Sequence, residues 1–456
     1  MMRQPPRPGA TTDGPAPRTP NVDDAGAGST HRLLRPFRPL AFREYRFMWL
    51  GQSCQAGSMW AERVARSVLI YQLTGSAVQL AGAEAMRGFA MLLLGAWGGV
   101  LADRLDKRAL LMMVQFWAFA VYSTIAVLAL TGHLQVWHLY ASTFGLSLGQ
   151  AVNQPVRTSM IPTIVPRDLV LGALTLNAMA VNASRMVTPV ATGLLIAVTR
   201  NGGWGYAIGS VLYFLMMLFT MQLRGNYRAG DEKTLPFLKS LAEGIRYVGR
   251  ERVVLAQMVI AYGPLSFAFA YQAILIVYVH ETLGGGAGML SLLFFFTGFG
   301  ALFGGFNIGT GTLTLRQGRI LFIAGVVDGA ALMLLGAAGW LPAAWLAFAV
   351  AALCMIGVGA TQVSFMSTNN SLLLVNTPSN LRGRVMGLTV FRQVVMAGAA
   401  FLGGIVAELT NGATALATLG ACCIAIVVGV TLWQPRILQL DGSRDTRAGR
   451  ASPPVA

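Results

Sequence analysis

The stretch ALLMMVQFWAFAVYSTIAVLALT, residues Ala109–Thr131, contains no charged side chain and is long enough to cross a bilayer as one helix. The hydrocarbon core of a membrane is about 30 Å thick, so a helix needs roughly 20 apolar residues to cross it. A second apolar run, Val78–Leu101, precedes this stretch, and the polar segment DRLDKR, Asp103–Arg108, separates the two. Two apolar runs joined by a short basic turn predict a pair of antiparallel transmembrane helices.

The same pattern recurs along the whole chain. The sequence predicts about twelve transmembrane helices in an all-α membrane protein, arranged as two pseudo-symmetric bundles of about six helices. Weak internal matches support the repeat, with Pro166 corresponding to Pro378 and Leu169 to Leu381. The other predicted helices span Phe47–Gln72, Val136–Ser159, Val170–Val198, Trp204–Leu223, Val253–Val279, Ala287–Ile308, Ile320–Gly339, Pro342–Met366, Val385–Glu408 and Gly412–Trp433.

The composition excludes most soluble classes of protein. Hydrophobic residues make up 55% of the chain and charged residues 11%, whereas an ordinary soluble domain has roughly 25% charged residues. The net charge of +16 does not indicate a nucleic-acid partner, because the basic residues lie between the apolar runs and not on a folded polar domain. The cysteines lie within apolar runs and the histidines are scattered, so we expect neither a metal nor a cofactor.

Charge and composition also divide the chain and orient it in the membrane. Most Lys and Arg residues fall on one side of the predicted helices, and Arg200 falls on the other, which predicts that both termini are cytoplasmic. The predicted parts are a disordered tail at 1–36, an N-terminal bundle at 37–223, a linker with an amphipathic helix at 224–252, a C-terminal bundle at 253–433 and a second tail at 434–456.

Five ionisable residues lie within two neighbouring predicted helices. Glu62, Arg63 and Arg66 share one helix face by their spacing, and so do Glu84 and Arg87. One hypothesis is an ion-pair network that closes the extracellular side. The other is that Glu62 or Glu84 binds and releases a transported proton. The arginines outnumber the glutamates, which suggests an anionic substrate such as a carboxylate or a catecholate.

Three further charges stand alone in apolar runs. Arg185 and Arg392 occupy roughly equivalent places in the two halves, and a buried arginine needs a partner. Arg392 could pair with Glu84 across the halves or with backbone carbonyl groups. For Asp328 we favour a structural pairing.

Several polar and aromatic residues fall on the helices expected to line a central cavity. Each has a packing role as an alternative, because hydrogen bonds between transmembrane helices use the same residue types. The candidate substrate contacts are Gln55, Trp60, Asn153, Tyr262, Tyr271, Gln272, Gln362 and Asn369.

Several segments carry a family resemblance. The loop GGVLADRLDKR, Gly98–Arg108, resembles the cytoplasmic loop between helices 2 and 3 of the major facilitator superfamily. The segments FRPLAFREYRFMWLGQ (Phe37–Gln52), YQLTGSAVQLAG (Tyr71–Gly82), NQPVRTSMIPTIVPRDLVLGALTLN (Asn153–Asn177) and LAEGIRYV (Leu241–Val248) look like its bacterial branch of drug and siderophore exporters, which includes enterobactin-exporter-like and transmembrane secretion effector proteins.

The resemblance implies the major facilitator fold and a monomeric exporter in the inner, cytoplasmic membrane. It would move an amphipathic or lipophilic small molecule by alternating access, in exchange for protons. The family role of the loop, a latch on the cytoplasmic side, is carried to Gly99, Asp103, Arg104 and Arg108.

The chain also departs from the family pattern. Helix 4 lacks the membrane arginine of many proton-coupled exporters, which counts against proton antiport. Alternatives are an importer or a lipid transporter of the same fold, or a membrane sensor or scaffold. With neither a phosphate-binding loop of the GxxxxGK[ST] kind nor a nucleophile and base at a recognisable spacing, we expect no ATP-driven pump and no enzyme.

Overall fold

The computed structural model describes residues 35–104, 106–225, 227, 237–309, 315–378, 381, 385, 387–388 and 391–440, and all their regular secondary structure is helical. The side chains of residues 35–36, 94–104, 237–241 and 307–309 are outside this description. The first helices of the chain are α2 (Arg43–Thr74), α3 (Ala77–Arg104), α4 (Lys107–Leu130), α5 (Val136–Ile164), α6 (Val170–Thr199) and α7 (Gly203–Met221).

The later helices follow the polar segment that joins the two parts of the chain. They are α8 (Phe237–Arg250), α9 (Arg252–Glu281), α10 (Ala287–Gly309), α11 (Gln317–Ala337), α12 (Ala344–Asn376), α14 (Phe391–Leu409) and α15 (Gly412–Trp433). Short 3₁₀ segments flank them: η2 (Arg35–Ala41), η3 (Arg167–Leu169), η4 (Ala338–Trp340) and η6 (Pro435–Gln439).

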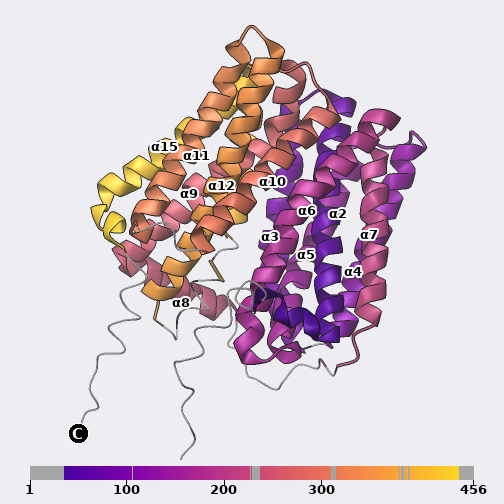
Figure 1. Cartoon of the computed structure of the whole chain (residues 1–456), viewed down its shortest axis with the longest axis vertical. Helices are drawn as coiled ribbons and strands as arrows, with labels where there is room; N and C mark the ends of the chain where they lie inside the picture. The colour runs from indigo at the N-terminus through magenta and orange to yellow at the C-terminus, as the bar shows by residue number, and fades with distance from the viewer. Residues whose placement is uncertain are drawn as a thin grey trace, which may run out of the picture.

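The long helices form two groups that lie side by side (Figure 1). In the N-terminal group, α2 packs against α6 and α7, α4 against α7, and α3 against α5. In the C-terminal group, α9 packs against α14 and α15, and α11 and α10 against α12. The groups meet through α6 against α10 and α3 against α14. We call the end that carries α8 and the first residues of α2 and α9 the basal end, and the opposite end the apical end.

Nine helices in the described part are long and apolar enough to cross a membrane, namely α4, α6 to α7, α9 to α12, α14 and α15. The helices α2, α3 and α5 are also long, but they fall outside this set. Charged and amide side chains lower the hydropathy of α2, which carries Glu62, Arg63 and Arg66. Two of these three helices, α2 and α3, carry the predicted charge network.

The helices extend beyond the apolar runs that predict them. The end of α5 lies at Ile164, past the predicted Ser159, and α12 continues to Asn376, past Met366. Hydropathy marks the hydrocarbon-spanning part of a helix, whereas backbone hydrogen bonds can continue it into the polar interface. At the C-terminus, Ile437 is buried and its carbonyl lies against Gly318, so the predicted tail from 434 begins with folded residues. Residues 1–34 and 441–456 lie outside the described residues.

The apolar core differs between the two ends of the molecule. Towards the apical end, one cluster of buried side chains contains residues of both groups, such as Trp60 and Leu69 with Ile274 and Phe294. At the basal end, a cluster around Met48 and Met160 belongs to the N-terminal group alone. Separate clusters, around Leu321 and Leu373, belong to the C-terminal group. The two groups therefore share a core apically and have separate cores basally.

Small residues bring the two groups together. A Cβ added to Gly193 on α6 would lie 1.8 Å from the Ser291 hydroxyl on α10, and one added to Gly404 on α14 would lie 2.7 Å from the Ala81 side chain on α3. Glycine at these positions allows close approach of backbones, as in many membrane helix pairs. The tight apical contact between the groups therefore depends on residues without a side chain.

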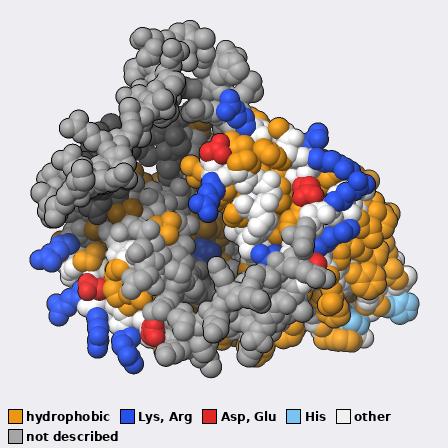
Figure 2. All heavy atoms as spheres, turned by 90° about the horizontal axis from the view of Figure 1, so that it is seen from below, with side chains coloured by type: hydrophobic (Ala, Val, Ile, Leu, Met, Phe, Trp, Pro, Cys, Tyr) orange, Lys and Arg blue, Asp and Glu red, His pale blue; other side chains and the backbone are white. Residues whose placement is uncertain are grey.

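Figure 2 shows the basal face, where Lys and Arg side chains gather around the rim. Exposed members of this set include Arg43, Arg167, Arg250, Arg252 and Arg319. The basal rim is therefore the basic end of the molecule, which is the signature of a cytoplasmic surface in membrane proteins.

Candidate functional site

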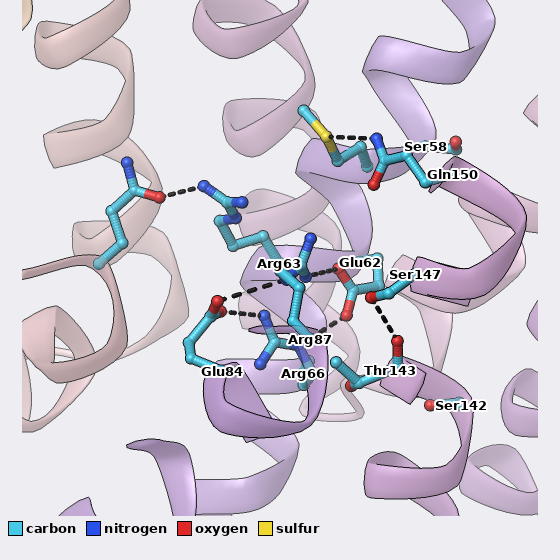
Figure 3. Close-up of polar contacts among 12 residues, drawn as sticks. Ser58, Glu62, Arg63, Arg66, Glu84, Arg87, Ser142, Thr143, Ser147 and Gln150 are labelled. Carbon is cyan, nitrogen blue, oxygen red and sulfur yellow. Dashed lines mark hydrogen bonds and ion pairs between the residues drawn. The ribbon is translucent and has the colours of Figure 1, made fainter. Parts of the chain in front are cut away.

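Four of the five charged residues on α2 and α3 form a closed ring of ion pairs in the apical half of the N-terminal group (Figure 3). Arg66 contacts Glu62 Oε1 through Nε at 2.6 Å and Glu84 Oε1 through Nη2 at 2.6 Å. Arg87 contacts Glu62 Oε2 through Nη2 at 3.3 Å and Glu84 Oε2 through Nε at 3.3 Å, although this last approach lacks hydrogen-bond geometry. Each carboxylate therefore contacts both arginines, and the ring has no net charge.

The ring is deeply buried, so each of its charges needs the others as partners. Glu62 and Arg66 are each 2% exposed. Removing one member of a buried ion pair leaves the other charge unpaired in a medium of low dielectric constant, which typically costs about 3–5 kcal/mol. A cavity of about 20 Å³ beside Glu62 and Arg87, also lined by Tyr122, Ser147 and Gln150, has room for about one water molecule. The ring links α2 and α3 firmly within one group.

Arg63 lies outside this ring, on the side of α2 that faces the C-terminal group. Its Nη1 donates a hydrogen bond to Gln272 Oε1 on α9, and its guanidinium carbon lies 4.9 Å from the centre of the Trp60 ring. Figure 3 shows this side chain pointing away from the glutamates that bind Arg66 and Arg87. The spacing that places Arg63 with Glu62 and Arg66 on one helix does not put it in the same ion-pair network.

Arg185 on α6 lies on the same tryptophan. Its guanidinium carbon is 5.4 Å from the centre of the Trp60 ring, and its Nη2 donates to Gln362 Oε1 on α12 at 3.1 Å and to the Tyr271 hydroxyl on α9 at 3.4 Å. Trp60 also packs on Phe294 of α10, with ring centres 5.8 Å apart. We call Trp60, Arg63, Arg185, Tyr271, Gln272 and Gln362 the central cluster. It lies midway along the helices, where the two groups meet.

Two of the alternatives for the isolated charges are now decided. The pairing of Arg392 with Glu84 is wrong, because the Glu84 carboxylate is taken by Arg66 and Arg87. Arg392 is half-buried on α14, and its carbonyl accepts a hydrogen bond from Ser266 at 3.4 Å. The buried Asp328 carboxylate accepts from the Thr361 hydroxyl on α12 at 2.8 Å, so its partner is a neutral group.

The remaining candidate substrate contacts are buried in other parts of the helices. Gln55, Asn153 and Asn369 are nearly inaccessible, and each has a side-chain oxygen without a hydrogen-bond donor in the described part of the chain. The Tyr262 hydroxyl likewise has no partner there. These four residues are not joined to the central cluster by a hydrogen bond.

Part of the predicted gate motif can be placed. The side chains of Gly99, Asp103 and Arg104 lie outside the described residues. Arg108 donates from Nη2 to the Met221 carbonyl at the end of α7, at 2.9 Å. This contact joins two helices of the N-terminal group.

One buried arginine was missed by the sequence analysis. Arg157 is 4% exposed inside α5, and its Nη2 donates to the Met48 carbonyl on α2. Gly51 on α2 lies beside it, because a Cβ added there would be in ordinary van der Waals contact with the guanidinium, at 3.4 Å. Arg157 lies near the end of the predicted helix Val136–Ser159, and the sequence analysis did not single it out as a buried charge. The signal that could have identified it is the polar pattern AVNQPVRTS at the end of this helix, which places an arginine next to small and amide side chains.

A large cavity lies at the apical end between the two groups. It has a volume of about 640 Å³ and is lined by residues of α2, α6, α9 and α10, including Tyr71, Arg200 and His280. The shared apolar core separates it from the central cluster. The molecule is therefore closed between the central cluster and the apical cavity.

Comparison with known proteins identifies relatives along almost the whole chain. A model of the transmembrane secretion effector family matches residues 34–455. The chain is similar to the enterobactin exporter EntS of Escherichia coli O6:K15:H31, with 23% identity over 408 residues that cover 89% of this chain and 95% of the relative. The enterobactin exporter EntS of Citrobacter koseri is also 23% identical, over 81% of this chain and 87% of the relative.

Solved transporters share the fold. A POT family transporter in complex with 5-aminolevulinic acid superposes with a TM-score of 0.68 at 14% identity, covering 87% of this chain and 96% of that one. The nucleoside transporter NupG superposes with a TM-score of 0.69 at 10% identity, covering 86% and 99%. At such identities the likeness concerns the fold.

Proposed function

The chain belongs to the transmembrane secretion effector family of major facilitator transporters, and we propose that it exports an amphipathic small molecule across the cytoplasmic membrane by alternating access. In this proposal α2, α3 and α5 cross the membrane together with the more apolar helices. Two bundles of about six helices then enclose the substrate path, with the central cluster midway along it.

The observation that carries the proposal is the different core at the two ends. Buried apolar side chains of both groups form one cluster apically, whereas each group keeps its own clusters basally. Rocking of two rigid bundles about a central site requires contacts that can break at one end while they form at the other. The present arrangement corresponds to the conformation that is closed apically.

The basal end is proposed to face the cytoplasm. Exposed arginines such as Arg43, Arg167 and Arg250 lie at this end, and cytoplasmic surfaces of membrane proteins carry the excess of Lys and Arg. With this orientation, the apically closed conformation is the one that receives substrate from the cytoplasm. The apical cavity near Tyr71 and His280 would then lie on the exit side.

The direction of transport is proposed from the relatives. The curated relatives that match most of the chain are named as exporters of enterobactin, a small molecule. The runner-up is an importer of the same fold. A lipid transporter or a scaffold would not need the polar residues of the central cluster at membrane depth.

The driving force is proposed to be the electrochemical proton gradient. In the version with direct proton exchange, Glu62 or Glu84 would bind the proton. Both carboxylates contact two arginines, so proton binding would require the ring to open. The ring serves equally well as a rigid support for Arg63 and Trp60 on the same helix.

The test is uptake by inside-out membrane vesicles, in which export appears as accumulation in the lumen. Energised vesicles with the wild-type chain are expected to accumulate a compound from a panel of siderophores and hydrophobic drugs, and a protonophore should abolish this. Trp60→Ala should remove the accumulation, whereas Trp137→Ala, at an exposed apical position, should not. Accumulation in right-side-out vesicles alone would instead establish an importer.

A further inference from the structure

A buried carboxylate in the C-terminal group has no positively charged partner. Asp328 on α11 is 4% exposed, and Glu62, at 2%, is the other carboxylate of comparable burial among the described residues. Glu62 contacts two arginines, whereas no Lys, Arg or His nitrogen in that part of the chain lies within 4.0 Å of the Asp328 carboxylate. Ionisable side chains at membrane depth are costly and are usually functional. The two acids therefore differ in kind, because Glu62 belongs to a ring of ion pairs and Asp328 does not.

The partner of Asp328 can form a hydrogen bond with it in either protonation state. The Thr361 hydroxyl on α12 lies 2.8 Å from Asp328 Oδ1 and 2.9 Å from the Gly357 carbonyl oxygen of its own helix. A hydroxyl has one hydrogen to donate and two lone pairs that accept. When Asp328 is ionised, Thr361 donates to the carboxylate. When Asp328 is protonated, its O–H donates to Thr361 Oγ1, and the hydrogen of Thr361 turns to the Gly357 carbonyl. One proton can therefore be added or removed while the two side chains stay in contact.

The space around this carboxylate fits a proton better than a metal cation. A cavity of about 10 Å³ adjoins Asp328, Thr361 and Gln362, which is room for about one water molecule at most. Its other walls come from α9, α11, α12 and α15 and are mostly apolar: Pro264, Leu265, Ala268, Gly325, Phe365 and Cys423. The Cys423 thiol, the other titratable group here, donates to the Gly325 carbonyl at 3.4 Å. Hard metal cations are held by several oxygen ligands, and these walls do not supply them.

Asp328 also lies close to a contact between the two groups of helices. Gln362, the residue after Thr361, accepts a hydrogen bond at Oε1 from Arg185 Nη2 at 3.1 Å and donates from Nε2 to the Ala268 carbonyl at 3.2 Å. Arg185, on α6 of the N-terminal group, is the cation that acts on Asp328 through space. Attraction between opposite charges is strong where the dielectric constant is low. An ionised Asp328 attracts this arginine and a protonated one does not, so its proton changes the force between the two groups.

We propose that Asp328 is the proton-binding residue of this transporter, with Thr361 as its hydrogen-bond partner. The inference rests on the proposed function and takes the coupling role away from Glu62 and Glu84. In the exchange of substrate for protons, one proton from the apical side converts the carboxylate to the carboxylic acid. The same proton leaves to the basal side and restores the carboxylate. The ring of ion pairs on α2 and α3 then stays closed throughout the cycle.

The first test measures the protonation of Asp328 directly. Purified full-length protein in lipid nanodiscs is titrated with pH, while infrared difference spectra record the C=O stretch of protonated carboxyl groups. A band of a buried carboxylic acid should appear as the pH falls, and Asp328→Asn should lose it. Asp168→Asn, which changes an exposed acid at the basal end, is the matched control and should keep it. Thr361→Val should shift the band, because the acid loses its hydrogen-bond acceptor, whereas Thr361→Ser should shift it less.

The second test asks whether this proton drives transport. Inside-out vesicles with Asp328→Asn should lose the accumulation that a protonophore abolishes in the wild type. They should still exchange labelled for unlabelled compound across the membrane, because the substrate path is intact. Vesicles with Asp168→Asn should accumulate the compound normally.

Three results would overturn the inference: the absence of a titrating band that Asp328→Asn removes, proton-driven accumulation that persists in this variant, and loss of the band in sodium chloride but not in choline chloride. The last would make a sodium ion the ligand. If Asp328→Asn fails to fold, the wild-type band and its shift in Thr361→Val carry the test. A titrating Asp328 band in protein that accumulates no compound would support the proton site and contradict the exporter alone.

Discussion

The apical contact between Glu408 and α3 gives a sharp prediction about alternating access. Glu408, near the end of α14, accepts hydrogen bonds through Oε2 from the Ser76 hydroxyl at 3.0 Å and from the backbone N–H groups of Ala77 and Val78 at 2.8 and 3.4 Å. A carboxylate from one group thus caps the first turn of a helix in the other. This contact exists only while the apical end is closed, so Glu408→Ala should favour apical opening.

The expected change in the ratio of open to closed protein follows from the free energy of this contact. Loss of a side-chain cap costs about 0.5–2 kcal/mol, and the exposed position of Glu408 places the effect near about 1 kcal/mol, since water can replace part of the contact. Each 1.4 kcal/mol is a tenfold change, so the ratio of apically open to closed protein should rise roughly fivefold.

The assay measures the distance between spin labels on the apical ends of the two groups. Exposed labelling sites are Thr131, after α4, and Ala344, at the start of α12, in a background without native cysteines. Glu281→Ala is the matched control, because Glu281 Oε2 accepts from the Gly412 N–H at 2.8 Å within the C-terminal group. It removes a similar cap without touching the interface. An unchanged distance distribution in Glu408→Ala, or equal shifts in both variants, would refute the reasoning.

Three more predictions concern the interface and the buried charges. Glu62→Gln should lower the free energy of unfolding in detergent by about 3–5 kcal/mol, because Arg66 and Arg87 lose a shared partner. A variant that melts normally but no longer couples transport to protons would instead support Glu62 as the proton carrier. Gly193→Ala should increase the apically open fraction in the spin-label assay, because its Cβ would lie 1.8 Å from the Ser291 hydroxyl, whereas Gly429→Ala, with open space around it, should not; similar behaviour of the two would contradict the close packing of α6 on α10. Arg157→Ala should lower the melting temperature, because the buried Met48 carbonyl loses the guanidinium donor and the fold loses roughly 1–3 kcal/mol of stability. An unchanged melting curve would show that this hydrogen bond does not stabilise the fold.

Much of the fold could be predicted from the sequence because the bilayer imposes a simple rule on each helix. A run such as Ala109–Thr131 has to form its hydrogen bonds within itself and has to be apolar for about 20 residues. The all-helical fold, the membrane location and the family followed from such runs and from the segment resemblances, and the structure and the comparisons confirm them. The predicted helix ends were less accurate, because helices continue into the polar interface with residues that hydropathy does not assign to a membrane span.

The candidate site was predictable only in part, because helix spacing fixes a side chain's direction on its own helix and says nothing of the neighbour's rotation. Glu62, Arg66, Glu84 and Arg87 were recognisable as unusual at membrane depth from the sequence alone. The tertiary structure decided that these four close on one another and that Arg63 turns away to Gln272.

The tertiary structure also decided how distant segments combine into one site. Arg185 lies far from Trp60 along the chain, and its contacts with Trp60, Tyr271 and Gln362 depend on how α6 packs between the two groups. The burial of Arg157 against Met48 depends likewise on the rotation of α5 against α2. The sequence by itself determined that the chain is a membrane protein built of long apolar helices and which charges stand out within the apolar runs, because hydration costs act on each segment separately. Which of these charges pair with one another was decided by the packing of helices that no local pattern encodes.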